Sequence, residues 1–191
     1  MSTSDRQARR IERLLVLIRH GKAAPKNVGL SDFERILTLK GGRECGRVAK
    51  AVADMGMKFD ILISSPADRA LETAHRVASA VNYPYLKIRI DDALYSSGTT
   101  RTLVAQIQKI DRKCKVVALC GHNPAIDNLA AHFVPKFGDS VEKGAMVGIA
   151  LGSESWRKAA KGSGSIRFIV TPSQVSTTNT QPKQTRRPRT S

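Results

Sequence analysis

Residues 14–21 of the 191-residue chain read Leu-Leu-Val-Leu-Ile-Arg-His-Gly, an apolar run that ends in Arg19, His20 and Gly21. Five consecutive apolar residues, some of them β-branched, are typical of a buried strand in a parallel sheet. Open α/β sheets bind ligands at the carboxyl ends of such strands, so the tripeptide is predicted to lie at a ligand site. Arginine offers phosphate a planar fork of donors, glycine allows close backbone approach, and imidazole can attack phosphorus.

The same arrangement recurs at two later junctions between a predicted strand and a predicted helix. After the strand at 59–63 comes Ser-Ser-Pro-Ala-Asp-Arg, which places Arg69 in the first turn of the next helix. After the strand at 115–120 comes Gly-His-Asn-Pro, with His122 and Asn123 at its centre. Because the carboxyl ends of parallel strands meet at one sheet edge, we expect two arginines and two histidines to converge on one phosphoryl pocket.

Apolar runs alternate with helical patterns, which predicts a three-layer α/β/α sandwich with a mostly parallel central sheet. Strands are expected at 14–18, 59–63, 86–90, 115–120, 146–151 and 166–170, and helices at 38–55, 66–81, 100–110 and 125–133. The folded domain is predicted over residues 14–173. Residues 1–13 are interpreted as a basic arm, and residues 174–191, which contain little that is apolar, as a disordered basic tail.

Composition indicates the compartment and the class of partner. The chain has no run of about 18 apolar residues and no apolar signal core near its start, so we expect a cytoplasmic protein without membrane contact. Three cysteines without paired spacing fit a reducing compartment. The net charge is +16, and most of it lies between the two basic ends. A basic body attracts anions, yet no interleaving of aromatic and basic residues indicates nucleic-acid binding, and we expect a monomer.

Several segments together resemble a known family. They are VLIRHGKA (16–23), SDFERILTLKG (31–41), SSPADRALETA (64–74), DDALY (91–95), ALCGHNPAIDNLA (118–130), SESW (153–156) and GSGSIRFIVTPS (162–173). In this order they resemble the RHG-motif branch of the histidine phosphatase superfamily and, more narrowly, the SixA-type phosphohistidine phosphatases. The resemblance covers about residues 13–173 and implies a phosphoglycerate-mutase-like fold.

The resemblance also implies a role for each matching residue. His20 would be the nucleophile that becomes phosphorylated, and Arg19 and Arg69 would clamp the phosphoryl oxygens. His122 would donate a hydrogen bond and stabilise charge in the transition state. Gly21 and Asn123 are expected to help bind the substrate. The implied reaction is hydrolysis through a phosphoenzyme, with no metal or other cofactor, because the arginines and the imidazole supply positive charge.

One departure from the superfamily bears on the substrate. Many members carry a Glu or Asp general acid shortly after the third strand, where this chain reads Leu-Tyr-Ser-Ser-Gly-Thr at 94–99. Asp91 and Asp92, which precede that stretch, are the fallback candidates. A protonated imidazole leaves readily without an acid, so the departure favours phosphohistidine over sugar phosphates.

The predicted function is the removal of phosphate from phosphohistidine in a phosphotransfer signalling protein. Three alternatives stay open: a phosphatase of small phosphorylated metabolites on the same site, a phospho-binding module that has lost catalysis, and a basic protein associated with RNA or polyphosphate.

For a few other polar residues the sequence allows two structural roles. Arg35 lies at the pocket rim or in a surface ion pair, and Ser64 and Ser65 line the pocket or cap the following helix. His75 and His132 are expected to pack against helix faces outside the site.

Overall fold

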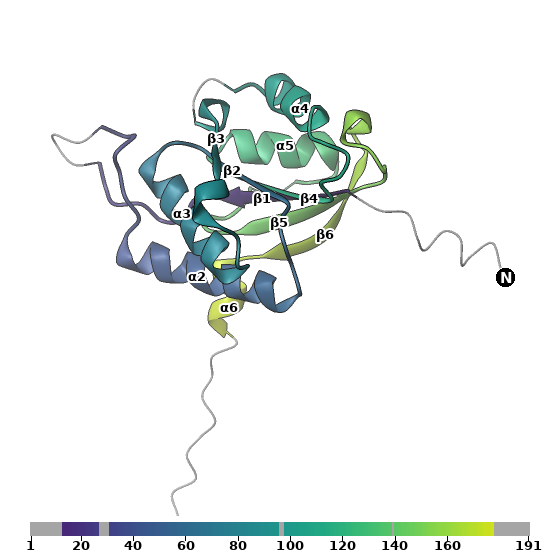
Figure 1. Ribbon diagram of the computed structural model, residues 1–191. Helices are drawn as coiled ribbons and strands as arrows, with labels where there is room; N and C mark the ends of the chain where they lie inside the picture. The colour runs from purple at the N-terminus through teal and green to yellow at the C-terminus, as the bar shows by residue number, and fades with distance from the viewer. Residues whose placement is uncertain (1–12, 27–30, 96–97, 139, 178–191) are drawn as a thin grey trace, which may run out of the picture.

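The computed structural model describes residues 13–26, 31–95, 98–138 and 140–177, which form a six-stranded sheet with helices on both faces (Figure 1). The strands are β1 (Arg13–Arg19), β2 (Ile61–Ser64), β3 (Arg89–Ile90), β4 (Val116–Gly121), β5 (Met146–Leu151) and β6 (Gly164–Val170). Their order is β3-β2-β4-β1-β5-β6. The first four strands pair in parallel, and β5 and β6 add antiparallel pairings at one side. The predicted fold class is confirmed as a mixed sheet with a parallel majority.

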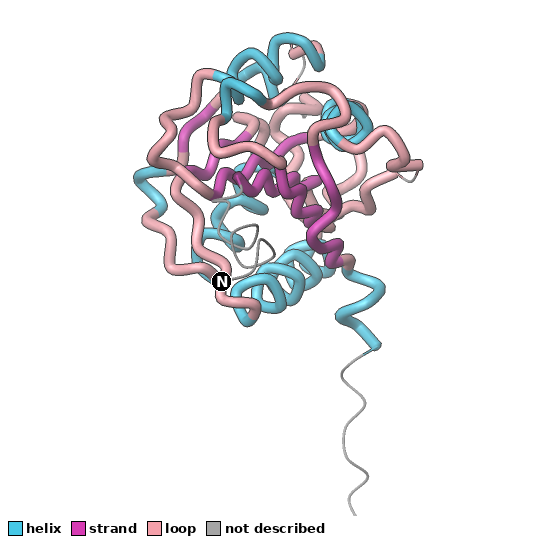
Figure 2. Tube along the Cα trace, turned by 90° about the vertical axis from the view of Figure 1, so that its right-hand side faces the viewer, coloured by secondary structure: helices cyan, strands magenta, loops and turns pink. Residues whose placement is uncertain are grey.

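Helices form the two outer layers. The longer ones are α2 (Leu39–Asp54), α3 (Asp68–Ala80), α4 (Thr100–Gln108) and α5 (Ala125–Phe133), and a short α6 (Pro172–Thr177) follows β6. Figures 1 and 2 show the sheet between these layers, with α2 and α3 on one side and α4 and α5 on the other. The side chains of β1 alternate between two cores: Leu15 and Leu17 pack towards α4 and α5, and Val16 and Ile18 pack towards α2 and α3. This burial on both faces explains why the strand is apolar throughout residues 14–18.

Local sequence explains where the helices that frame the site begin. The Oγ1 of Thr38 accepts a hydrogen bond of 2.9 Å from the amide of Gly41, which caps α2. Helix α3 buries mainly small residues against the sheet, and these let its first turn lie close to the strand ends; they are Ala70, Thr73, Ala74, Val77 and Ala78. Helix α5 coincides with its predicted range, because its apolar residues recur at helical spacing.

Two predicted elements differ from the structure. The strand predicted at 86–90 is a strand only over Arg89–Ile90, because Tyr85–Lys87 form a short 3₁₀ helix and the side chain of Leu86 is fully exposed. The prediction read an apolar leucine as buried, which is wrong here. Helix α3 begins at Asp68, so Pro66 lies before the helix rather than in its first turn.

The ends of the predicted domain also shift. Residue Arg13, assigned to the basic arm, is buried as the first residue of β1. Residues 174–177, assigned to the disordered tail, belong to α6, whose Val175 packs against the core between the sheet and α2. The rest of the arm, 1–12, and the rest of the tail, 178–191, lie outside the described residues. No helix in the described part of the chain is long and apolar enough to cross a membrane.

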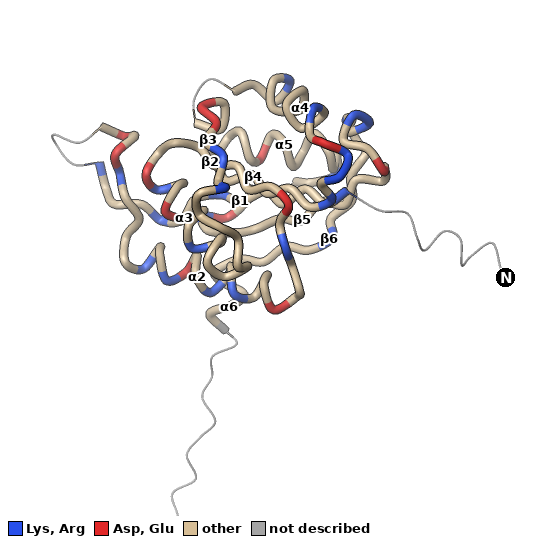
Figure 3. Tube along the Cα trace, viewed as in Figure 1, with Lys and Arg blue, Asp and Glu red and all other residues tan. Residues whose placement is uncertain are grey.

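Basic side chains are spread over the folded body. In Figure 3, lysine and arginine residues occur on α2, on β6 and on the connection from α4 to β4, with acidic residues interspersed. The positive charge of this protein is therefore not confined to its ends.

Candidate active site

The predicted site residues meet in one pocket at the carboxyl ends of β1, β2 and β4. This pocket, hereafter the phosphoryl pocket, has a volume of about 390 Å³. It is lined by Arg19, His20, Asp32, Arg35, Arg69, Tyr95, His122, Asn123 and Lys143. Residues from three strand ends thus converge although more than 100 positions separate the first from the last, as the parallel topology predicts.

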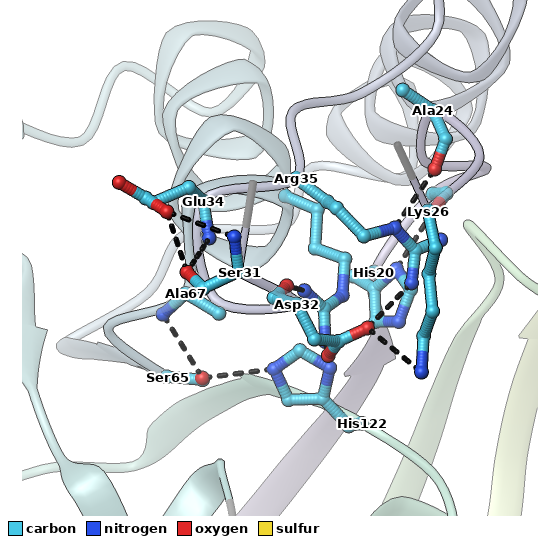
Figure 4. A network of polar contacts seen from close by, with 12 residues as sticks. His20, Ala24, Lys26, Ser31, Asp32, Glu34, Arg35, Ser65, Ala67 and His122 are labelled. Atoms are coloured by element: carbon cyan, nitrogen blue, oxygen red, sulfur yellow. Dashed lines mark hydrogen bonds and ion pairs between the residues drawn. The ribbon is translucent and has the colours of Figure 1, made fainter. Parts of the chain in front are cut away.

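The ring of His20 is held as a neutral nucleophile. Its Nδ1 lies 2.7 Å from the carbonyl oxygen of Gly21 (Figure 4 shows the ring among its neighbours). A carbonyl only accepts, so Nδ1 carries the proton and the neutral ring has its lone pair on Nε2. The pKa of His20 is lowered to about 4, mainly by burial and with smaller contributions from the nearby cations Arg69, Arg19 and Lys143, while the hydrogen bond to Gly21 opposes the shift. The imidazole is therefore neutral near pH 7.

His122 faces His20 across the pocket floor. The ring centroids are 4.7 Å apart, and Nε2 of His122 lies 2.9 Å from the Oγ of Ser65. Burial lowers the pKa of His122 to about 3, with smaller contributions from His20 and Arg69. A bound dianion would oppose this shift and favour the protonated ring, because an opposite charge stabilises the charged form. His122 can thus donate to a phosphoryl oxygen.

A carboxylate holds two arginines in place at the pocket mouth. The Oδ2 of Asp32 lies 2.8 Å from an Nη of Arg69, and its backbone oxygen accepts a second hydrogen bond from the same guanidinium. The Oδ1 of Asp32 lies 2.6 Å from an Nη of Arg35. Arg35 lowers the pKa of Asp32, and Arg69 lowers it further, so this carboxylate stays ionised and is a poor proton donor. Arg35 accordingly lies at the pocket rim and in an ion pair at once.

Arg19 is fixed through a loop and α5. Its guanidinium donates to the carbonyl oxygen of Val141 at 2.7 Å, and its Nε is buried without a partner among the described residues. The amide of Val141 donates to Asp127 at 2.8 Å, and the same carboxylate accepts from Asn123 and from Ser140. Asp127 therefore ties together the loop that holds Arg19 and the residue that follows His122.

Gly21 makes structural contacts beside the site. It does not line the phosphoryl pocket. Its amide donates to Thr73 Oγ1 at 3.1 Å, and its carbonyl receives the bond from His20. A Cβ at this position would collide with the sulfur of Cys45. The close approach that the structure shows for this glycine is therefore to α2, and a contact between Gly21 and substrate stays a prediction.

The remaining acid and histidine candidates lie outside the phosphoryl pocket. Asp91 accepts a hydrogen bond from the amide of Ala93, and Asp92 is exposed; neither lines the phosphoryl pocket. His75 stacks edge-on with Tyr85 outside the site.

Nearer the site, Ser65 holds His122 and also accepts from the amide of Ala67, whereas the hydroxyl of Ser64 donates to the carbonyl of Ser65. His132 contacts Phe133 outside the pocket.

Sequence reasoning missed three residues of the pocket. Asp32 stands three positions before Arg35 in SDFER, a spacing that could have suggested the ion pair. Tyr95 ends the segment DDALY, whose two carboxylates drew attention away from its aromatic ring. Lys143 comes from the loop before β5, where nothing in the sequence distinguishes it from other surface lysines.

The fold and the site define a class: an α/β protein in which a neutral imidazole lies among fixed cations at the strand ends. Residues 15–96 match the family model of the histidine phosphatase superfamily, branch 1. The chain belongs to this superfamily. Among the described residues, no group of three or more His, Cys, Asp or Glu side chains is arranged to hold a metal ion.

Two curated relatives are similar in sequence. The mitochondrial serine/threonine-protein phosphatase Pgam5 of Drosophila persimilis is 32% identical over 77 residues, which are 40% of this chain and 26% of that protein. The match thus spans about a quarter of that relative. An uncharacterised protein of Picosynechococcus sp. is 30% identical over 118 residues, which are 61% of this chain and 70% of that protein.

Solved structures are similar in fold. The protein histidine phosphatase SixA, solved with tungstate, superposes with a TM-score of 0.74 at 21% identity, covering 85% of this chain and 99% of that one. A mycobacterial glucosyl-3-phosphoglycerate phosphatase superposes with a TM-score of 0.61 at 13% identity, covering 82% and 98%. At such identities the likeness establishes the shared fold.

Proposed function

We propose that the protein is a phosphatase that takes a phosphoryl group onto His20 and then hydrolyses the phosphohistidine. The observation that carries this proposal is the hydrogen bond from Nδ1 of His20 to the carbonyl of Gly21. It leaves Nε2 as the nucleophilic atom, and the pocket around it also contains Arg19, Arg69 and Lys143. A module that only binds phosphate gains nothing from a ring fixed in this tautomer.

The reaction has two displacements at phosphorus. In the first, Nε2 of His20 bonds to phosphorus, and the bond from phosphorus to the leaving group breaks with its electron pair on the leaving group. In the second, a water oxygen bonds to phosphorus, the bond to Nε2 breaks, and phosphate leaves with the proton that the water gives up. Arg19, Arg69 and His122 stabilise the charge on the phosphoryl oxygens in both steps, because their donors are fixed before the substrate arrives.

The proposed substrate is phosphohistidine on a phosphotransfer protein. Asp32 is the one carboxylate among the described residues lining the phosphoryl pocket, and its ion pairs with Arg35 and Arg69 keep it ionised. The leaving group must therefore depart unaided or arrive protonated, as an imidazole can. The fold likeness to the protein histidine phosphatase SixA supports the same assignment. We further propose that the protein acts in the cytoplasm as a monomer.

A phosphatase of small metabolites is the second candidate. The fold likeness to a glucosyl-3-phosphoglycerate phosphatase favours it. It requires a proton source for an alkoxide leaving group, which would have to be a bound water, the substrate itself or His122 after the bound dianion has favoured its protonated form.

The test compares leaving groups. Purified protein is given a phosphohistidine-bearing phosphotransfer protein, an aryl phosphate and a panel of sugar phosphates, with His20→Asn as the inactive control. The proposal expects kcat/KM to be far higher for phosphohistidine and the aryl ester than for any sugar phosphate. Sugar phosphates turned over as fast as phosphohistidine would replace the proposal with the metabolite phosphatase.

A further inference from the structure

A second pocket adjoins the phosphoryl pocket and shares a wall with it. The common wall consists of Tyr95, His122 and Asn123. The second pocket has a volume of about 360 Å³ and lies between the segment that follows β3 and the first turns of α4 and α5. Its remaining lining residues are Ala93, Gly98, Thr99, Thr100, Pro124, Ala125 and Asn128. A volume of this size is within the range of pockets that enclose small ligands.

The two pockets differ in charge. Arg19, Arg35, Arg69 and Lys143 line the phosphoryl pocket. The described residues that line only the second pocket are aliphatic, hydroxyl or amide residues, with no Lys, Arg, Asp or Glu among them. A carboxylate placed in the second pocket would lose water without gaining a cationic partner there, which is costly.

The helix ends beside the second pocket do not supply the missing positive charge. At the start of α4 the amides of Thr102 and Leu103 already donate to Thr99. At the start of α5 the amide of Ile126 donates to the carbonyl of His122. The negative charge of Asp127, also in the first turn of α5, offsets the positive potential that the helix dipole creates at that end.

The dividing wall is well supported. The ring of Tyr95 packs edge-on against Phe33 at 5.4 Å and against His122 at 5.4 Å, and the guanidinium of Arg69 lies 5.9 Å from its centre. These contacts hold the ring between the cationic pocket and the uncharged one.

We infer that the second pocket holds the leaving group of the substrate, and that it selects a leaving group without a permanent charge. This inference rests on the proposed function, and it restricts the substrate class. A heteroaromatic ring such as imidazole fits, with Tyr95 beside it and the side chains of Thr100 and Asn128 lining the same pocket as hydrogen-bonding groups. A leaving group that bears a carboxylate, as in phosphoglycerates, does not.

Binding affinity tests the inference without requiring turnover. The probes are inorganic phosphate, benzylphosphonate and 4-carboxybenzylphosphonate, titrated calorimetrically into the full chain. Wild-type protein is expected to bind benzylphosphonate at least about tenfold more tightly than its carboxylated analogue, since one uncompensated charge costs about that much or more.

A charge-introducing variant locates the leaving group. Asn128→Lys places a cation in the second pocket and should tighten binding of the carboxylated analogue by about tenfold, with phosphate affinity little changed. The matched control is Ala131→Lys, which puts the same charge on an exposed position of α5, outside both pockets, and should leave the ratio of the two phosphonates unchanged.

The outcomes separate the two claims. Equal binding of the two phosphonates by the wild type, or equal effects of Asn128→Lys and Ala131→Lys, would overturn the leaving-group assignment while leaving the proposed function in place. Failure of inorganic phosphate to bind the folded protein would overturn the proposed function, and the leaving-group assignment with it.

Discussion

His20 and His122 are neutral imidazoles surrounded by permanent cations, which suits a pocket that waits for a dianion. Burial lowers the pKa of both rings, and the pocket keeps Arg19, Arg69 and Lys143 close to them. In the free protein the arginines are restrained by a backbone carbonyl and by the carboxylate of Asp32. A phosphoryl group therefore meets donors that are already oriented, so little reorganisation is needed on binding.

Truncation of the three oxygen-contacting residues should reduce catalysis strongly. We expect Arg19→Ala, Arg69→Ala and His122→Ala each to lower kcat by about 10²–10³-fold, the usual effect of losing one transition-state donor. Steady-state kinetics with an aryl phosphate measures this. Arg167→Ala, at an exposed position of the edge strand β6, is the control and should leave kcat unchanged. Near-normal kcat in any of the three would remove that residue from the mechanism.

Sequence reasoning located residues at strand ends better than residues on loops. Arg19, His20, Arg69 and His122 follow strands or open helices whose apolar patterns are strong, so topology alone brings them together. Asp32 and Lys143 reach the pocket from connecting segments, whose paths no periodicity encodes. The contact of Gly21 with α2 could not be predicted either, because it depends on three-dimensional packing rather than on a sequence pattern.

Among the elements, α5 does most to assemble the site. It begins two residues after Asn123, and its first turn carries Asp127, whose carboxylate binds that residue and the loop at 140–141. Its apolar stripe made its range predictable. The strand predicted at 86–90 is too long because Leu86, which the prediction placed in the core, is exposed in the structure. A short apolar run at a sheet edge therefore predicted structure less well than helical periodicity did.

The carboxylate of Asp127 should act on catalysis through Arg19. Asp127→Ala removes acceptors for Asn123, Ser140 and the amide of Val141, so the loop that restrains Arg19 loosens. We expect kcat to fall by about tenfold or more and the free energy of unfolding to fall by about 1–3 kcal/mol.

A purely structural role for Asp127 is distinguished by a second variant. Ser140→Ala deletes the Ser140 hydroxyl but leaves the bond from Val141 to Asp127, so it should lower stability slightly and kcat hardly at all. If Asp127→Ala lost stability while kcat and KM stayed at wild-type values, Asp127 would not position Arg19.

For the molecule as a whole, the two buried imidazoles make folding sensitive to acid. Between an ordinary pKa of 6.5 and the folded values of about 4 for His20 and about 3 for His122, the unfolded chain binds protons that the folded chain excludes. The free energy of unfolding therefore falls as pH drops through this window and is fully retained only above it. Each pKa unit corresponds to about 1.4 kcal/mol, so the loss due to His20 is up to about 3 kcal/mol by pH 4.

Replacing either imidazole should flatten this dependence. Chemical denaturation of wild type, His20→Asn and His122→Asn at pH values from 7 down to 4 measures how the free energy of unfolding of each protein changes with pH. Each variant is expected to lose less stability on acidification than the wild type, because asparagine does not titrate and the carboxylates contribute equally to all three proteins. Parallel curves for all three would mean that the rings titrate normally in the folded state.

The most direct test of the proposed mechanism is to trap the phosphoenzyme. The protein is mixed with an aryl phosphate, quenched in alkali within the first turnover and analysed by peptide mass spectrometry, with His20→Ala as the control. The mechanism predicts one phosphoryl group, stable to alkali and labile to acid, on the peptide that contains His20, and none in the variant. A phosphoryl group on another residue, or one that persists in His20→Ala, would contradict the assignment of His20 as the nucleophile.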